Sequence, residues 1–145
     1  MTKGGQELVY CSLGGAGEIG MNLNLFGYGK LGEYKWIIVD IGVTFSDDNI
    51  PGIEVILPNP EFIANQKENL LGIVLTHAHE DHVGAIAHLW PMLECPIYAT
   101  PFTAAIVREK FKEKKMFASP PVKITRYFFF VSLIIFCTSS LIKPI

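Results

Sequence analysis

Apolar residues in this chain fall into short runs that are separated by glycine-rich and polar segments. Runs of four to eight residues that are rich in β-branched and aromatic side chains are typical of buried strands. The strands predicted in this way are Leu8–Leu13, Met21–Phe26, Lys35–Gly42, Leu70–Thr76 and Cys95–Thr100. The segments Gly27–Tyr34 and Ser46–Gly52 have the composition of turns and loops.

Helical patterns lie between the later strands. Val83–Leu93 has apolar positions at helical spacing, and Pro101–Lys115 has an early proline and lysines at its end, where the helix dipole favours them. A short helix is predicted within Pro58–Gln66, with Asn59 as its cap and Pro60 at its first position. Strands that alternate with helices predict an α/β fold class.

Three glycines, Gly15, Gly17 and Gly20, spell G-x-G-x-x-G after the first predicted strand. A dinucleotide site would need a helix to follow, so that its N-terminus faces the pyrophosphate. Here "MNLNLFGYG" follows, and it alternates like a strand. A tight, glycine-permitted connection between two strands is therefore favoured. The alternative is a loop whose backbone lines a site nearby.

Composition places the chain among ordinary globular proteins. It has 145 residues, a formal net charge of -2 and 50% apolar residues. This size indicates one domain or part of one, and the charge balance gives no nucleic-acid footprint by itself. The cysteines Cys11, Cys95 and Cys137 are widely spaced, which is typical of reduced thiols in a cytoplasmic protein.

Three of the four histidines gather in "VLTHAHEDHVGAI", directly after a predicted strand. His77 and His79 lie two residues apart, so in an extended segment their side chains point the same way and can bind one ion. Asp81 and His82 follow, and they can turn toward a second ion or the opposite side of the same cavity. Imidazole and carboxylate groups suit zinc, manganese or iron. The competing interpretation is a polar loop whose histidines merely cap the following helix, with Asp81 as a cap of Val83–Leu93.

Three further residues near this motif have to be assigned. Asp40 ends a buried strand, where a carboxylate is costly unless it is paired. We expect it to hold the second ring nitrogen of a ligand histidine, rather than to be a solvated strand end. His88 and Glu80 are expected to be exposed residues outside the site.

With these residues identified, the chain resembles a known family. "THAHEDH" is similar to the HxHxDH signature of the metallo-β-lactamase fold, and the wider pattern resembles the ribonuclease J group of β-CASP nucleases. The segments that carry the resemblance are "LGGAGEIGMN" at Leu13–Asn22, "IIVDIGVTF" at Ile37–Phe45, "PNPEFIANQ" at Pro58–Gln66, "GIVLTHAHEDHVGAI" at Gly72–Ile86 and "CPIYATPFTAAIV" at Cys95–Val107.

The resemblance implies two zinc ions, with manganese as an alternative, and a bound hydroxide that attacks an RNA phosphodiester. It implies that His77 and His79 bind one zinc ion, that Asp81 and His82 bind the other, and that Asp40 supports them. Asp81 is also assigned as the catalytic residue. RNA is the expected partner, together with a homo-oligomeric copy or a complementing C-terminal fragment. No membrane partner is expected, and the expected location is cytoplasmic.

The resemblance also implies donors that this sequence does not contain. No histidine follows His88 and no aspartate follows Asp81. We therefore expect the N-terminal half of a metallo-β-lactamase αββα sandwich, with residues 1–126 as a partial domain and an apolar face left exposed. Residues 127–145 do not resemble the family, and an out-of-frame read is the favoured explanation of this tail. A membrane-surface anchor and a buried strand pair are the alternatives.

Overall fold

The computed structural model describes residues 5–46, 52–115 and 120–125, and the apolar tail and most of the Ser46–Gly52 loop lie outside these ranges. The described strands are β1 (Glu7–Gly14), β2 (Leu23–Gly29), β3 (Lys35–Ile41), β4 (Thr44–Phe45), β5 (Val55–Ile56), β6 (Leu70–Val74), β7 (Ile97–Ala99) and β8 (Val122–Ile124). The helices are α1 (Glu61–Ala64), the 3-10 turn η1 (Lys67–Asn69), α2 (Glu80–Val83), α3 (Ile86–Leu93) and α4 (Pro101–Glu113). The chain is thus mixed α/β, as the sequence predicts.

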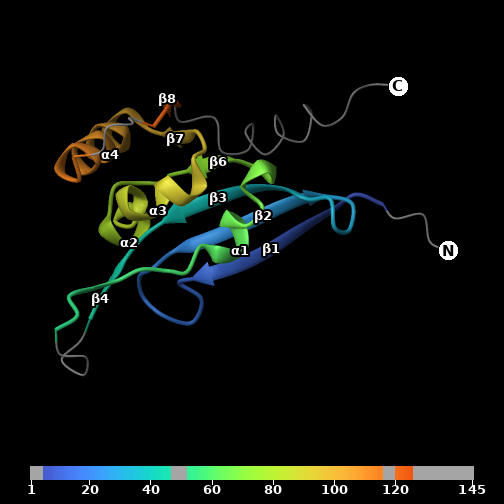
Figure 1. Cartoon of the computed structure of the whole chain (residues 1–145), viewed down its shortest axis with the longest axis horizontal. Coiled ribbons are helices and arrows are strands. Elements are labelled where there is room, and N and C mark those ends of the chain that lie inside the picture. Colours follow the sequence, from blue (N-terminus) through green and yellow to red (C-terminus); the bar gives the residue numbers. More distant parts are fainter. Residues whose placement is uncertain (1–4, 47–51, 116–119, 126–145) are drawn as a thin grey trace.

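Six of the described strands form one sheet in the order β1-β2-β3-β6-β7-β8 (Figure 1). The strands β1, β2 and β3 are antiparallel neighbours, whereas β3, β6, β7 and β8 run parallel. Parallel neighbours end at the same edge of a sheet, so the residues that follow β3 and β6 are brought together there. The register confirms this, because Val39 pairs with Val74 near the ends of both strands.

The core lies between the sheet and helices α3 and α4. Alternate residues of β2 and β3 are buried, including Leu23, Leu25 and Ile38, which are fully enclosed. The predicted apolar face of α3 is buried against them, and it consists of Ile86, Leu89, Trp90 and Leu93. This burial supplies the apolar surface that holds the helices on the sheet.

The predicted helix Val83–Leu93 is wrong in one respect, because it is two helices. The chain leaves α2 after Val83 and enters α3 at Ile86. Between them, the backbone N–H of Ala85 donates to the carbonyl oxygen of Ile41 at 3.1 Å. This bond ties the break between the helices to the end of β3.

The boundary of the second strand also differs from the prediction. Strand β2 continues through Gly29, although Gly27–Tyr34 was expected to be a turn. A Cβ atom on Gly27 would lie 2.7 Å from the indole ring of Trp36, so this glycine makes room for a buried ring within a strand. The turn itself is limited to the residues between β2 and β3.

The starts of two helices show how far the predicted signals hold. Helix α4 begins with the expected proline, and Thr100, which was predicted as the last residue of a strand, caps it by accepting from the backbone N–H of Thr103. Asn59 accepts from the N–H of Glu61 at 2.9 Å, although α1 itself begins at Glu61, one residue later than predicted.

One strand edge is open among the described residues. On its outer side β1 pairs with no other strand of this part of the chain, and Leu8 and Tyr10 are exposed on it. This agrees with the expected exposure of an apolar surface. No helix within the described ranges is long and apolar enough to span a membrane.

Candidate metal centre

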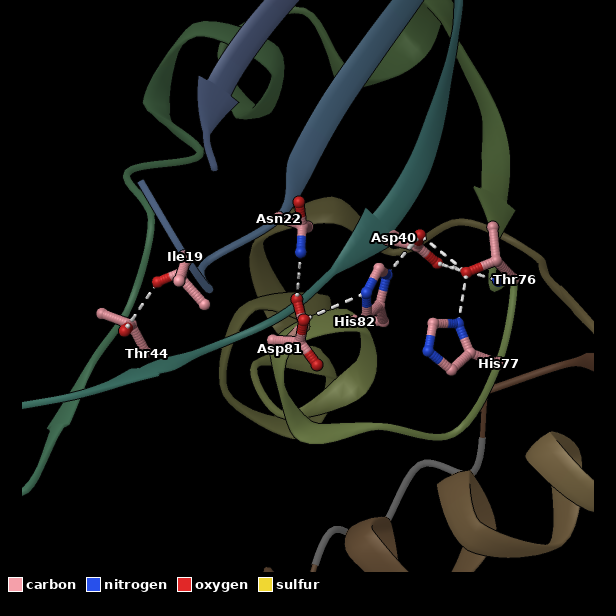
Figure 2. A network of polar contacts seen from close by, with 8 residues as sticks. All are labelled: Ile19, Asn22, Asp40, Thr44, Thr76, His77, Asp81 and His82. Carbon is pink, nitrogen blue, oxygen red and sulfur yellow. Dashed lines mark hydrogen bonds and ion pairs between the residues drawn. The ribbon is translucent and has the colours of Figure 1, made fainter. Parts of the chain in front are cut away.

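The four motif residues lie where β6 passes into α2. His77 and His79 are in the connecting segment, and Asp81 and His82 are in the single turn of α2. Figure 2 shows His77, Asp81 and His82. The ring centroid of His77 lies 4.5 Å from that of His79 and 4.1 Å from that of His82. The fold therefore gathers three imidazole rings on one side of the sheet edge, with both His77 and His79 exposed.

Asp40 is the acceptor behind this cluster. Asp40 is 4% exposed, and one of its carboxylate oxygens lies 2.8 Å from Nδ1 of His82. It also accepts the backbone N–H of Thr76 at 2.8 Å. The buried charge is thus met by several donors, which offsets the cost of its burial. This is the placement that the sequence predicts for a carboxylate supporting a ligand histidine.

The backbone at Asp40 has an unusual conformation. Its φ angle is 65°, in the left-handed region that non-glycine residues adopt only rarely, with aspartate among the exceptions. Such conformations cost on the order of 1–3 kcal/mol and persist where the surroundings enforce them. Here the hydrogen bonds from Thr76 and His82 hold the carboxylate in place.

Asp81 and His82 contact each other directly. Nε2 of His82 lies 3.1 Å from a carboxylate oxygen of Asp81, and the Asp81 side chain is 39% exposed. Asp81 lies within α2 and therefore does not cap it, and His79 stands at the cap position without a side-chain capping hydrogen bond. Neither residue caps α2 with its side chain, which contradicts the capping interpretation for these two residues.

The residue after the glycine-rich loop holds the backbone of the motif. Asn22, which follows the loop, donates to the carbonyl oxygen of Asp81 from its backbone N–H at 3.2 Å and from its side-chain Nδ2 at 2.9 Å. The chain then enters β2, not a helix, so the G-x-G-x-x-G segment has no helix for a pyrophosphate. The segment joins the antiparallel neighbours β1 and β2, so the favoured interpretation, a connection between two strands, is confirmed.

Gly42 makes this close packing possible. The carbonyl oxygen of Asn22 accepts from the N–H of Gly42 at 2.8 Å. A Cβ atom on Gly42 would lie 1.7 Å from the carbonyl oxygen of Asp81. Any larger residue would therefore push the motif away from the end of β3. Asn22 and Gly42 were not recognised as site residues from the sequence.

Glu80 and His88 lie at the margin of the site. Glu80 pairs with Lys110 of α4 at 2.5 Å, so it is an ion-pair partner and not merely solvent-facing. His88 is exposed on α3, as predicted. Partial burial lowers the pKa of His88, and the nearby charges of Lys114 and Lys110 lower it further.

The donor set fits a divalent metal in its chemistry. Nδ1 of His82 is engaged by Asp40, which is the usual support of a ligand imidazole, and carboxylate and imidazole groups lie side by side. Within the described ranges, however, no three His, Cys, Asp or Glu side chains converge closely enough to hold an ion. The described residues thus provide donors of the right kind without a closed set.

Comparison with known proteins gives one family and a set of relatives. The Metallo-beta-lactamase superfamily matches residues 31–131. "Ribonuclease J" of Sinorhizobium meliloti (strain Sm2011 / Rm2011 / 2011) is 50% identical over 119 residues, which cover 82% of this chain and 21% of that protein. "Ribonuclease J" of Helicobacter pylori (strain ATCC 700392 / 26695) is 36% identical over 101 residues, or 70% of this chain and 14% of that protein.

Among solved structures, the chain is similar to one described as "Crystal Structure of a New Diphosphatase from the PhnP Family". The TM-score is 0.44 at 17% identity, over 81% of this chain and 43% of that chain. The chain spans about a fifth or less of the length of the two ribonuclease J relatives above.

Proposed function

Because this chain belongs to the Metallo-beta-lactamase superfamily and is homologous to ribonuclease J, we propose that it forms the front part of a metal-dependent ribonuclease. One observation carries this proposal. His77, His79 and His82 are gathered at the shared end of β3 and β6, with the buried carboxylate of Asp40 behind them. The three histidines, together with Asp81, form the HxHxDH pattern that resembles the superfamily signature.

In this proposal His77 and His79 hold one metal ion and Asp81 and His82 hold the other. Zinc is the expected metal, with manganese as the alternative. When bound, such ions lower the pKa of a coordinated water toward about 7 and neutralise charge on the phosphoryl oxygens. RNA is the proposed substrate, and phosphodiester hydrolysis is the proposed reaction.

The protein's own groups orient these donors. Asp40 accepts from Nδ1 of His82, which leaves Nε2 facing Asp81. Asn22 donates two hydrogen bonds to the backbone carbonyl oxygen of Asp81. His82 thus contacts the carboxylate of Asp81, and Asn22 holds its backbone. The side chain of Asp81, the proposed catalytic carboxylate, stays accessible to solvent.

A complete two-metal centre of this kind needs donors that the 145 residues do not contain, as no histidine follows His88 and no aspartate follows Asp81. We propose that a complementing C-terminal part provides them, within a cytoplasmic protein. A homo-oligomeric copy is the other proposed partner. The competing function is a non-catalytic remnant that binds at most one metal ion, and a hydrolase of the same fold with another substrate is a third candidate.

A chimera tests the proposal. The region of the S. meliloti relative that this chain matches is replaced by the matching 119 residues of this chain. We expect the chimera to cleave 5′-monophosphorylated RNA with zinc or manganese, and the isolated chain not to do so. His77→Ala should abolish cleavage, whereas His88→Ala, at an exposed position outside the cluster, should retain it.

Three results would contradict the proposal or part of it. A folded chimera that binds metal but leaves RNA intact would favour the remnant or another substrate. Equal cleavage by the chimera and its His77→Ala variant would place the metal centre elsewhere. Tight binding of two metal ions and RNA turnover by the isolated chain would contradict the need for a complementing part.

A further inference from the structure

The hydroxyl group of Thr76 lies between two residues of the candidate metal centre. Its Oγ1 atom is 2.9 and 2.8 Å from the two carboxylate oxygens of Asp40, and 3.0 Å from Nδ1 of His77 (Figure 2). The backbone N–H of Thr76 separately donates to Asp40 at 2.8 Å. Thr76 is therefore anchored to the carboxylate by its backbone as well as by its side chain.

The number of protons decides the direction of these bonds. A hydroxyl group has one proton to donate, and an ionised carboxylate can only accept. The proton of Thr76 therefore points to Asp40, so its oxygen is left as an acceptor toward His77. Nδ1 of His77 must then carry a proton and donate it to Thr76. In a neutral ring, Nε2 is the nitrogen that keeps a free electron pair.

We propose that Thr76 is a positioning residue that holds His77 in the Nδ1–H tautomer and so makes Nε2 its metal-binding atom. Asp40 thus supports two histidines of the motif, His82 directly and His77 through the threonine hydroxyl. The meaning for metal binding rests on the proposed function, but the tautomer itself is a property of the metal-free chain.

A serine at this position keeps the hydroxyl, and a valine removes it with little change in shape. Neither change removes the backbone N–H that Thr76 donates to Asp40. The variants therefore test the hydroxyl contacts to Asp40 and His77 separately from the backbone hydrogen bond. Thr44 offers a matched control. Its hydroxyl donates to the carbonyl oxygen of Ile19 at 3.1 Å, away from the histidine cluster (Figure 2).

The test is the two-bond proton–nitrogen NMR spectrum of the ¹⁵N-labelled, metal-free 145-residue chain. It is recorded at about pH 8, above the usual histidine pKa of about 6.5. We expect His77 to show the Nδ1–H pattern in the wild type, in Thr76→Ser and in Thr44→Val. In Thr76→Val it should shift toward the Nε2–H form, which an imidazole without such a partner prefers.

Zinc affinity of the same variants gives a second readout. Loss of a supporting hydrogen bond typically weakens metal binding by about 10–100-fold, so Thr76→Val should bind zinc at least about 10-fold more weakly, and Thr76→Ser should bind like the wild type. An Nε2–H pattern for His77 in the wild type would overturn the inference without any variant. An unchanged tautomer in folded Thr76→Val would do so as well. Neither readout depends on RNA cleavage. A failure of this inference can therefore be distinguished from a failure of the proposed function.

Discussion

Replacing Gly42 by alanine tests how tightly the motif is held against the sheet. The new Cβ atom would lie 1.7 Å from the carbonyl oxygen of Asp81 and 2.7 Å from the backbone nitrogen of His82. To reach even a tight contact of about 3.0 Å, the backbone of Asp81 would have to move by about 1.3 Å. That movement strains or breaks both hydrogen bonds that Asn22 donates to the same carbonyl oxygen.

The expected cost follows from these contacts. Overpacking costs about 1–3 kcal/mol and each lost hydrogen bond about 1 kcal/mol, so Gly42→Ala should lower the free energy of unfolding by about 3–5 kcal/mol. Urea denaturation followed by circular dichroism measures this loss. Gly5→Ala is the control, because no atom lies within 4 Å of its added Cβ, and it should stay within about 0.5 kcal/mol of the wild type. The expected strain would be refuted by a Gly42→Ala variant whose free energy of unfolding falls by less than about 1 kcal/mol. The same variant would also have to keep the wild-type NMR chemical shifts of the backbone amides in the histidine motif.

Three further predictions concern single side chains. Asn22→Ala should lower the free energy of unfolding by about 1 kcal/mol, because the hydrogen bond from Nδ2 to the carbonyl oxygen of Asp81 is lost. An unchanged free energy of unfolding in urea denaturation would show that this hydrogen bond does not stabilise the fold. The NMR titration midpoint of His88 should lie below about 6.5, and Lys114→Ala should raise it only part of the way, since burial is the larger cause. A lowered pKa means that the unfolded state takes up the proton more readily, so this group reduces stability as the pH falls below the usual histidine pKa. Burial raises the pKa of Cys95 to about 12, so iodoacetamide should modify half-buried Cys11 faster than Cys95 in peptide mass mapping, and equal rates for these two residues would contradict this.

Much of the fold could be predicted because its signals are local. The long apolar runs predicted β3 and β6, and the proline and lysines of Pro101–Lys115 predicted α4. These predictions succeeded because burial and capping depend on residues within each segment. The strands β4 and β5 have only two residues each, which is too short for a periodic pattern, so the sequence did not predict them. The break between α2 and α3 depends on Ile41, which is distant in sequence.

The candidate site divides in the same way. The residue types and spacing of the histidine motif point to metal chemistry, and the cost of a buried carboxylate singles out Asp40. Thr76, Asn22 and Gly42 were missed because their roles depend on pairings between separate strands and loops. Their positions beside conspicuous sequence features were the available signal, since Thr76 precedes the first histidine of the motif, Asn22 follows the glycine-rich loop and Gly42 follows β3.

The central claim is that these residues provide the front half of a metal centre and not a complete one. Metal content of the purified 145-residue chain, measured by mass spectrometry after equilibration with zinc and removal of free ion, tests it most directly. We expect one zinc ion per chain, lost in His77→Ala and retained in His88→Ala. Two tightly held ions per chain, or one that persists in His77→Ala, would contradict it.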